Sequence, residues 1–168
     1  MHPRVSVGPS PIAGRGLIAQ TALALGTVVI RLGGTVVSTE QLHALFDTAA
    51  ALNTYIDTFA IGDDTHLVLP DHTDIHYGNH SCDPTLWPVG TFELATRRAL
   101  ATGDEITIDY GLISDDPDFS MTCACRTATC RRVITGVDWQ RADLQQRYAN
   151  HWPAGLQRRI DRLMRGNS

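Results

Sequence analysis

Four cysteines constrain the fold of this chain more than any other feature of its 168 residues. Cys123, Cys125 and Cys130 follow the pattern C-x-C-x4-C, and Cys82 lies far upstream of them. A tetrahedral zinc site needs four soft ligands, and the cysteine count supplies four with none left over. The spacing therefore predicts that the fold brings Cys82 beside the later loop, where the four thiolates bind one structural Zn²⁺. The disfavoured alternative is a set of four free buried thiols.

The polar stretch His76–Pro84 surrounds the first of these cysteines. Four hydrogen-bonding or metal-binding side chains stand there in consecutive positions: Asn79, His80, Ser81 and Cys82. Strand-forming runs flank the stretch, and so polar a segment rarely enters a core unless its groups are engaged. A zinc ion bound to Cys82 would pin the later cysteine loop beside this stretch and make one wall of a site.

Charge and the N-terminus restrict the compartment and the partners. The first residues, 1–4, are not followed by an apolar signal core, and no apolar run approaches the length of a membrane span. We therefore expect a cytoplasmic protein without a membrane partner, in a compartment where thiols stay reduced. The formal charge of -4 and the pI of about 5.9 argue against direct binding to nucleic acid.

The pattern of turns and short runs predicts a mainly β fold. Ser38 and Gln41 form a capping box before one helical repeat of apolar residues, and two further helices are expected, from about Asp138 to Tyr148 and from Pro153 onward. Short strands separated by Gly, Pro and Asp turns are expected elsewhere, at 27–31, 35–37, 55–61, 65–69, 91–97 and 105–110. The chain length fits one domain with a small appendage.

Four motifs together resemble those of SET-domain protein lysine methyltransferases, of the small bacterial single-domain type. Residues 79–84 (NHSCDP) and 103–111 (GDEITIDYG) are similar to the two signature motifs of that family. The C-x-C-x4-C segment resembles the post-SET zinc motif, and residues 14–17 (GRGL) resemble the N-terminal glycine motif. The four stand in the family's order and spacing and cover residues from about 5 to 135.

The resemblance implies a β-clip SET fold in which the Asn79 and Tyr110 segments form a pseudoknot. It divides the chain into a SET domain (5–112), a post-SET zinc-binding segment (113–135) and a C-terminal helical extension (136–168). It also implies S-adenosylmethionine as methyl donor and, as partner, a protein or peptide that carries the acceptor lysine.

The same resemblance assigns the site residues. Tyr110 falls at the catalytic tyrosine that ends the lysine channel. The cofactor-binding positions are Arg15, Gly16, Tyr55, Asn79, His80 and Tyr110. His80 also invites interpretation as a general base, but the family pattern favours a structural or cofactor-binding role.

Several positions depart from the family pattern. His76 stands where Arg is common, Leu32 where Tyr is common, and Ile108 where an aromatic is usual. These departures favour, mildly, an alternative function: a catalytically silent SET-like module that binds a peptide or protein. Tyr110 and Asn79 favour the enzyme. A zinc-ribbon nucleic-acid binder fits the cysteines but not the acidic charge.

The charged residues give two further hypotheses about the substrate. Asp57, Asp63, Asp64, Asp115 and Asp116 would make an acidic mouth that suits Lys/Arg-rich segments, although acidic loops are usually just solvated. All 14 basic residues are arginines. Compositional drift is the simpler cause, and the alternative is that a lysine-modifying enzyme without lysine cannot modify itself.

Overall fold

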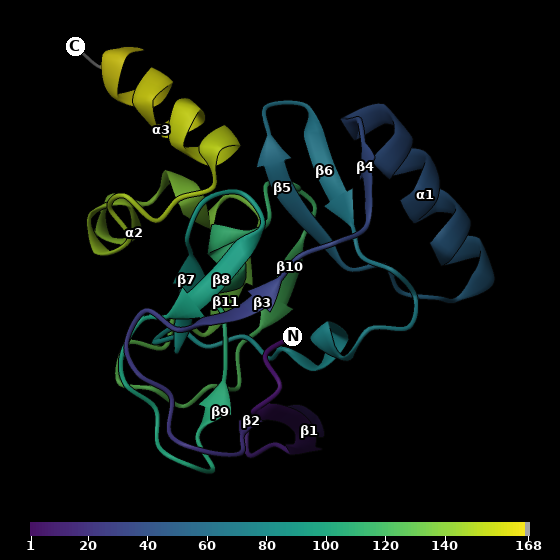
Figure 1. The fold of residues 1–168 in the computed structure, drawn as a ribbon. Coiled ribbons are helices and arrows are strands. Elements are labelled where there is room, and N and C mark those ends of the chain that lie inside the picture. The colour runs from purple at the N-terminus through teal and green to yellow at the C-terminus, as the bar shows by residue number, and fades with distance from the viewer. Residues whose placement is uncertain (167–168) are drawn as a thin grey trace.

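The computed structural model describes residues 1–166 as a set of small antiparallel sheets, with one helix on one side and the C-terminal helices on the opposite side (Figure 1). The last two residues of the predicted extension 136–168 lie outside the described residues. The prediction of a mainly β fold with C-terminal helices is confirmed. Among residues 1–166, no helix has both the length and the apolar character that crossing a membrane would need.

Three of the sheets have three strands each, and the fourth has two. The first contains β1 (Val5–Pro9), β2 (Arg15–Ala19) and β9 (Glu105–Ile106), and the second contains β3 (Val28–Arg31), β8 (Glu93–Thr96) and β7 (Leu86–Pro88). The third contains β4 (Thr35–Val37), β6 (Thr65–Val68) and β5 (Thr58–Gly62), and the last pairs β10 (Ser120–Thr122) with β11 (Val133–Thr135).

The first helix, α1 (Thr39–Leu52), begins where the capping box predicts. The Ser38 side chain accepts a hydrogen bond from the Gln41 amide, and the Gln41 side chain accepts one from the Ser38 amide. The helix ends at Asn53 in the left-handed conformation, with φ of 51°, as is common after a last helical turn. Only Leu42 and Ala49 of α1 are buried, so much of the helix faces outward.

The C-terminal part differs from the expectation of a continuous helix over 138–148. A short 3₁₀ turn, η3 (Asp138–Gln140), is followed by an extended residue, Arg141, and then by α2 (Ala142–Arg147). Asp138, at the start of this turn, is buried and accepts hydrogen bonds from Arg131 and Thr135. The last helix, α3 (Ala154–Gly166), starts directly after Pro153, near its predicted start.

Helix α3 lies against β5 at very short range. A Cβ on Gly155 would come within 2.4 Å of the Gly62 carbonyl oxygen, so this contact depends on glycine. Leu156 and Ile160 of α3 are buried in the main core, which also contains Tyr148 and Trp152. The C-terminal helices are therefore part of the packed molecule.

Two short 3₁₀ turns position the residues of the predicted site: η1 (Asp74–Tyr77) and η2 (Tyr110–Leu112). The strand predicted over 105–110 ends as β9 after Ile106, and the chain then leaves the sheet. Asp109 caps η2 by accepting a hydrogen bond from the Gly111 amide at 3.0 Å. Tyr110 is thus fixed at the start of a turn.

Candidate functional site

The two signature stretches meet side by side. His80 and Ile108 form a parallel bridge, in which the Ile108 amide donates to the Asn79 carbonyl at 3.2 Å and the Ser81 amide donates to the Ile108 carbonyl at 3.1 Å. Farther along, the Thr85 and Leu86 amides donate to the Thr107 carbonyl at 3.2 and 2.9 Å. This pairing brings Asn79 and His80 next to Tyr110, although the two stretches are about thirty residues apart in the chain.

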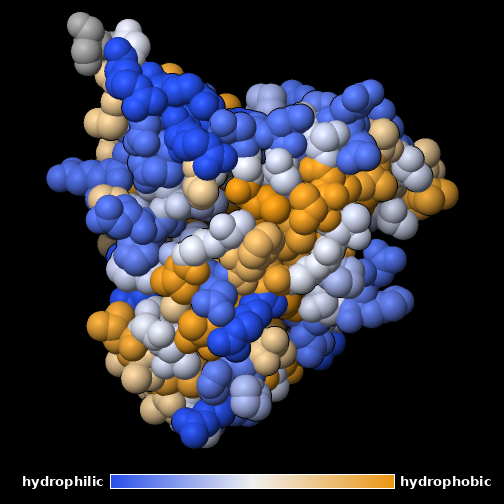
Figure 2. Space-filling view, turned by 45° about the horizontal axis from the view of Figure 1, so that its top comes forward, coloured by the Kyte–Doolittle hydropathy of each residue, from blue (hydrophilic) through white to orange (hydrophobic). Residues whose placement is uncertain are grey.

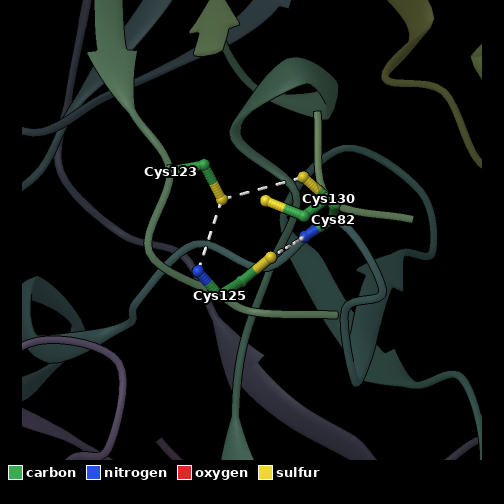
Figure 3. Close-up of side chains that lie close together, drawn as sticks. All are labelled: Cys82, Cys123, Cys125 and Cys130. Carbon is green, nitrogen blue, oxygen red and sulfur yellow. Dashed lines mark hydrogen bonds between the residues drawn. The ribbon is translucent and has the colours of Figure 1, made fainter. Parts of the chain in front are cut away.

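The four cysteines come together, as their spacing predicts (Figure 3). Their sulfur atoms all lie within 4.8 Å of one another, and the Sγ atoms of Cys82 and Cys123 are 3.8 Å apart. Sulfur atoms bonded to one tetrahedral zinc at about 2.3 Å would themselves be about 3.8 Å apart. The cluster can therefore hold one metal ion of this kind with little rearrangement.

Backbone amides favour charged sulfur at this cluster. The Arg131 amide donates to the Cys82 sulfur at 3.3 Å, and the amides of Cys82 and Cys125 donate to the sulfurs of Cys125 and Cys123, each at 3.5 Å. Burial nevertheless raises the pKa of Cys82 to about 11. A bound cation would favour the ionised form of this sulfur, and the donor set suits a zinc ion.

His80 lies between the cysteine cluster and Tyr110. Its Nδ1 accepts a hydrogen bond from the Tyr110 amide at 3.1 Å, and its Nε2 faces the Cys82 sulfur at 3.3 Å. Burial lowers the pKa of His80 to about 4, against a smaller opposing effect of Asp109, so the ring is neutral and carries its hydrogen on Nε2. Both nitrogens are engaged, so the ring is unsuited to act as a base in the site.

Asn79 ties the N-terminal glycine motif to β9. Its Nδ2 donates to the Arg15 carbonyl at 2.9 Å and to Glu105 Oε1 at 2.7 Å, and Glu105 also accepts from the Ser10 hydroxyl at 2.8 Å. A Cβ on Gly16 would lie 2.3 Å from Glu105 Oε1, so the glycine leaves room for this cluster. The structure thus brings Arg15, Gly16 and Asn79 together, with polar groups suited to the amino-acid part of a cofactor.

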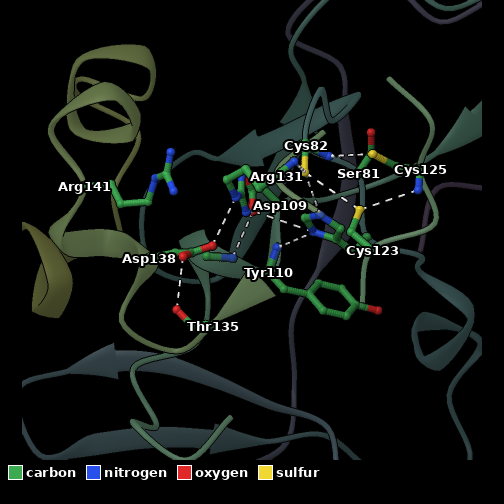
Figure 4. A network of polar contacts seen from close by, with 12 residues as sticks. Ser81, Cys82, Asp109, Tyr110, Cys123, Cys125, Arg131, Thr135, Asp138 and Arg141 are labelled. Atoms are coloured by element: carbon green, nitrogen blue, oxygen red, sulfur yellow. Dashed lines mark hydrogen bonds and ion pairs between the residues drawn. The ribbon is translucent and has the colours of Figure 1, made fainter. Parts of the chain in front are cut away.

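A buried ionic network, which the sequence did not reveal, supports the chain just before Tyr110 (Figure 4). Asp109, whose side chain is 0 % exposed, accepts two hydrogen bonds from the Arg131 guanidinium, each at 2.6 Å, and one from the Tyr148 hydroxyl at 2.9 Å. Arg131 also donates to Asp138 at 3.0 Å. The network links the η2 turn to the cysteine loop and to the C-terminal helices.

Tyr110 lines a large cavity on the other side of the turn. The cavity has a volume of about 650 Å³, and its walls include Tyr55, Ile108 and Phe119. The Tyr110 hydroxyl donates to the Gly78 carbonyl at 2.8 Å. Burial, with additional effects of Tyr55 and Asp57, raises the pKa of Tyr110, so its hydroxyl stays protonated at neutral pH. An apolar band crosses the face that carries α1 in Figure 2.

The predicted site residues lie in three places: the cavity, the N-terminal loop and the surroundings of the cysteines. Tyr110 and Tyr55 line the cavity, and the Tyr55 side chain is largely exposed. The Asn79 cluster lies at the N-terminal loop, and the His80 ring faces the cysteines. A cofactor contact by His80 would therefore have to use its backbone.

Most carboxylates of the predicted acidic mouth already have partners. Asp63 pairs with Arg158 and Arg162, and Asp115 pairs with Arg159 at 2.8 Å. Asp64 accepts from the Thr39 amide at 3.0 Å, and Asp57 pairs with His76. Asp116 lines the cavity, together with Asp47 and Asp118, which were not among the residues predicted to form the mouth.

Three departures from the family pattern fall at different places. Ile108 and His76 line the cavity, whereas Leu32 is buried in the core. The first two can therefore influence what the cavity accepts.

Comparison with known proteins agrees with this arrangement. The SET domain family model matches residues 14–111, which is more than half of the chain. Histone-lysine N-methyltransferase ash1 of Drosophila melanogaster is 28 % identical over 73 % of this chain, and histone-lysine N-methyltransferase 2D of Homo sapiens is 29 % identical over 76 %. Methyltransferase flvH of Aspergillus flavus is 34 % identical over 45 % of the chain.

The chain spans only 6 %, 2 % and 44 %, respectively, of the length of these three relatives. The family match nevertheless includes the glycine motif, the Asn79 stretch and Tyr110, and the Asn79 stretch contacts the other two segments. The chain belongs to the SET-domain family.

Proposed function

We propose that this chain is an S-adenosylmethionine-dependent methyltransferase that acts on the ε-amine of a lysine in a protein. The observation that carries the proposal is the position of Tyr110, whose hydroxyl is held by the Gly78 carbonyl in the wall of a 650 Å³ cavity. The assignment to lysine methylation is supported by relatives that are named as histone-lysine methyltransferases.

The reaction requires a neutral, oriented amine. A free lysine has a pKa of about 10.4, so its deprotonation at pH 7 costs roughly 4–5 kcal/mol. Apolar cavity walls such as Ile106, Ile108 and Phe119 disfavour the charged ammonium and so lower this cost. The Tyr110 hydroxyl donates its hydrogen to Gly78, so its oxygen is free to accept a hydrogen bond from the amine. That contact would orient the amine lone pair.

Arg15, Gly16, Asn79 and the His80 backbone would hold the cofactor, with Tyr55 and Tyr110 at its methyl end. S-adenosylmethionine, when bound, supplies an electrophilic methyl group on a positively charged sulfur. Cys82, Cys123, Cys125 and Cys130 would hold one structural zinc ion, which supports the polypeptide around Tyr110 without taking part in the chemistry.

The acceptor is proposed to be a Lys/Arg-rich protein segment, such as a histone tail. Asp47, Asp116 and Asp118 line the cavity and would attract cationic side chains beside the target lysine. This proposal for the substrate rests on the relatives' names and on these charges. The test therefore includes histones, which the names suggest, and a whole-cell lysate with many other proteins.

The test uses radiolabelled S-adenosylmethionine with core histones and with a whole-cell lysate. Tyr110→Phe and a metal-depleted sample serve as controls, and cofactor binding is titrated in each preparation. We expect label on a discrete protein, reduced at least 100-fold in Tyr110→Phe. Because the chain has no lysine, label on the enzyme itself cannot be lysine automethylation. Folded, zinc-loaded protein that does not bind the cofactor would contradict the proposal and favour a silent binding module.

A further inference from the structure

Asp57 and His76 form a half-buried pair in the wall of the Tyr110 cavity. The His76 Nδ1 contacts Asp57 Oδ2, and the His76 Nε2 lies 2.8 Å from the Pro70 carbonyl oxygen. A carbonyl oxygen can only accept, so Nε2 must carry a hydrogen. The proton that converts the neutral ring to imidazolium therefore sits between Nδ1 and the Asp57 carboxylate.

The pair shares with Tyr110 the cavity in which the amine would react. Asp57, His76 and Tyr110 line the same cavity, and Tyr55 lies beside them. After burial and Tyr55, the charge of Asp57 is a further cause that raises the pKa of Tyr110, so its field reaches the tyrosine hydroxyl. The side chains of His76 and Asp57 are 27 % and 24 % exposed, which leaves a route for a proton to water.

We propose that Asp57 and His76 are the proton acceptor for the substrate ammonium. This inference rests on the proposed methyltransferase function. The lysine Nζ–H bond breaks as the proton passes to an Asp57 oxygen, and the proton then bonds to the lone pair of His76 Nδ1. One N–H bond is lost and one is gained, and the total charge stays the same. The amine keeps its lone pair for the methyl group, and the imidazolium later releases the proton to water.

The pKa of His76 suits this task. Burial alone would lower it, but the hydrogen bonds to Asp57 and Pro70 and the charge of Asp57 outweigh burial and raise the pKa above its ordinary value. A base works best when its pKa is near the working pH. Other charged or titratable groups face the pair or share the cavity: Asp71, Tyr55, Tyr110, His43, Asp47, Asp116 and Asp118.

Position 76 offers an informative substitution. An arginine there would still provide a cation beside Asp57, but its guanidinium cannot give up or accept a proton in this range. His76→Arg therefore separates proton acceptance from charge pairing, and Asp57→Asn removes the first acceptor. His72→Arg makes the same substitution at an exposed position outside the cavity lining and serves as the matched control.

The first experiment measures kcat and KM for methylation of core histones from about pH 6 to about pH 10. The wild type should gain activity as the pair loses its proton and then level off. In Asp57→Asn, kcat should fall about 100-fold near neutral pH. The loss should be smaller at high pH, where the lysine ammonium loses its proton without help from the enzyme. His76→Arg should keep its KM, but its kcat should fall, and the rise in activity that accompanies deprotonation of the pair should disappear from its pH profile. If the pH profile of His76→Arg matches those of the wild type and of His72→Arg, this inference is overturned while the proposed methyltransferase function stands.

The second experiment does not need methyl transfer. The His76 ring signal, identified by its absence in His76→Arg, is titrated by NMR with and without saturating N-acetyl-lysine amide. An ammonium beside the pair should lower the pKa of His76 by roughly one unit, and Asp57→Asn should abolish the response. An unchanged titration would overturn the inference. Absent methyl transfer with no cofactor binding would instead contradict the proposed function.

Discussion

The two sides of Tyr110 are built in opposite ways. On the side of the cysteine cluster, here called the cysteine side, the side chains of Asp109 and Arg131 are only 0 % and 5 % exposed, and they hydrogen-bond to each other. On the cavity side, Tyr55 is 78 % exposed, and most of α1 faces outward. The first side pairs its buried charges within the protein, whereas the second leaves apolar side chains exposed. The difference indicates which side fixes the tyrosine and which side is open to a ligand.

The cysteine side can be rigid because its charges compensate one another. A buried carboxylate without a partner is strongly unfavourable. The hydrogen bonds from the Arg131 guanidinium and the Tyr148 hydroxyl therefore stabilise Asp109 in its buried position. These partners come from the cysteine loop and from the C-terminal helices. The position of Tyr110 therefore depends on segments that follow it in the chain.

Metal removal should have the largest effect on this side. Structural zinc sites contribute about 10–16 kcal/mol in small domains, which rivals the total stability of about 5–15 kcal/mol of a typical protein. We expect chelation to disorder the β10–β11 region and to abolish methyl transfer. NMR spectra and melting curves, with metal analysis, would measure this. Added Zn²⁺ should restore both, whereas an unchanged melting temperature in verified metal-free protein would show that the cysteines are not a structural metal site.

Removing the guanidinium of Arg131 should have the next largest effect. Arg131→Met leaves Asp109 and Asp138 buried without their cation, and breaking such a pair costs about 3–5 kcal/mol. The matched control is Arg141→Met, because Arg141 pairs with Asp143 at the surface, where such pairs contribute less than about 1 kcal/mol. Urea unfolding would measure both free energies. Equal losses of unfolding free energy in the two variants would mean that the buried network stabilises the protein no more than a surface ion pair does.

Tyr148→Phe should have a smaller effect on the same network. It removes one hydrogen bond to the Asp109 carboxylate and little volume, so about 1.5–3 kcal/mol of unfolding free energy should be lost. If the network positions Tyr110, kcat should fall while the KM for the acceptor stays nearly constant. Tyr77→Phe is the control, since Tyr77 is half-exposed and contacts Arg15 through its ring. If the Tyr148→Phe variant is stable and its kcat is unchanged, the C-terminal helices do not help to position Tyr110.

The sequence predicted local and chemically distinctive features well. The capping box at Ser38 needs only neighbouring residues, and the four cysteines could be grouped because their number and type match one kind of site. The mainly β fold was likewise readable from short runs and turns. These features depend little on where distant segments pack.

Partners set by tertiary packing could not be predicted. Arg131 is one of 14 arginines, and nothing in its neighbourhood indicates that it bonds to Asp109, 22 residues earlier. His76 stood out as a departure from the family pattern, but its partner Asp57 was assigned to an acidic mouth. The helix expected over 138–148 was wrong in its first turn, where Asp138 accepts a hydrogen bond from Arg131, the same residue that binds Asp109.

The smallest effect on stability, and the sharpest contrast, should come from the cavity side. Tyr55→Ala removes an exposed side chain, so the free energy of unfolding should change by less than about 0.5 kcal/mol. If Tyr55 covers the cofactor or the acceptor, kcat/KM should nevertheless fall about tenfold, which corresponds to about 1.4 kcal/mol of lost contact in the transition state. Phe92→Ala, at an exposed aromatic outside the cavity, should leave kcat/KM unchanged. A loss of stability without a loss of activity in Tyr55→Ala would reverse the comparison, because the cavity wall would then support the fold and not the ligands.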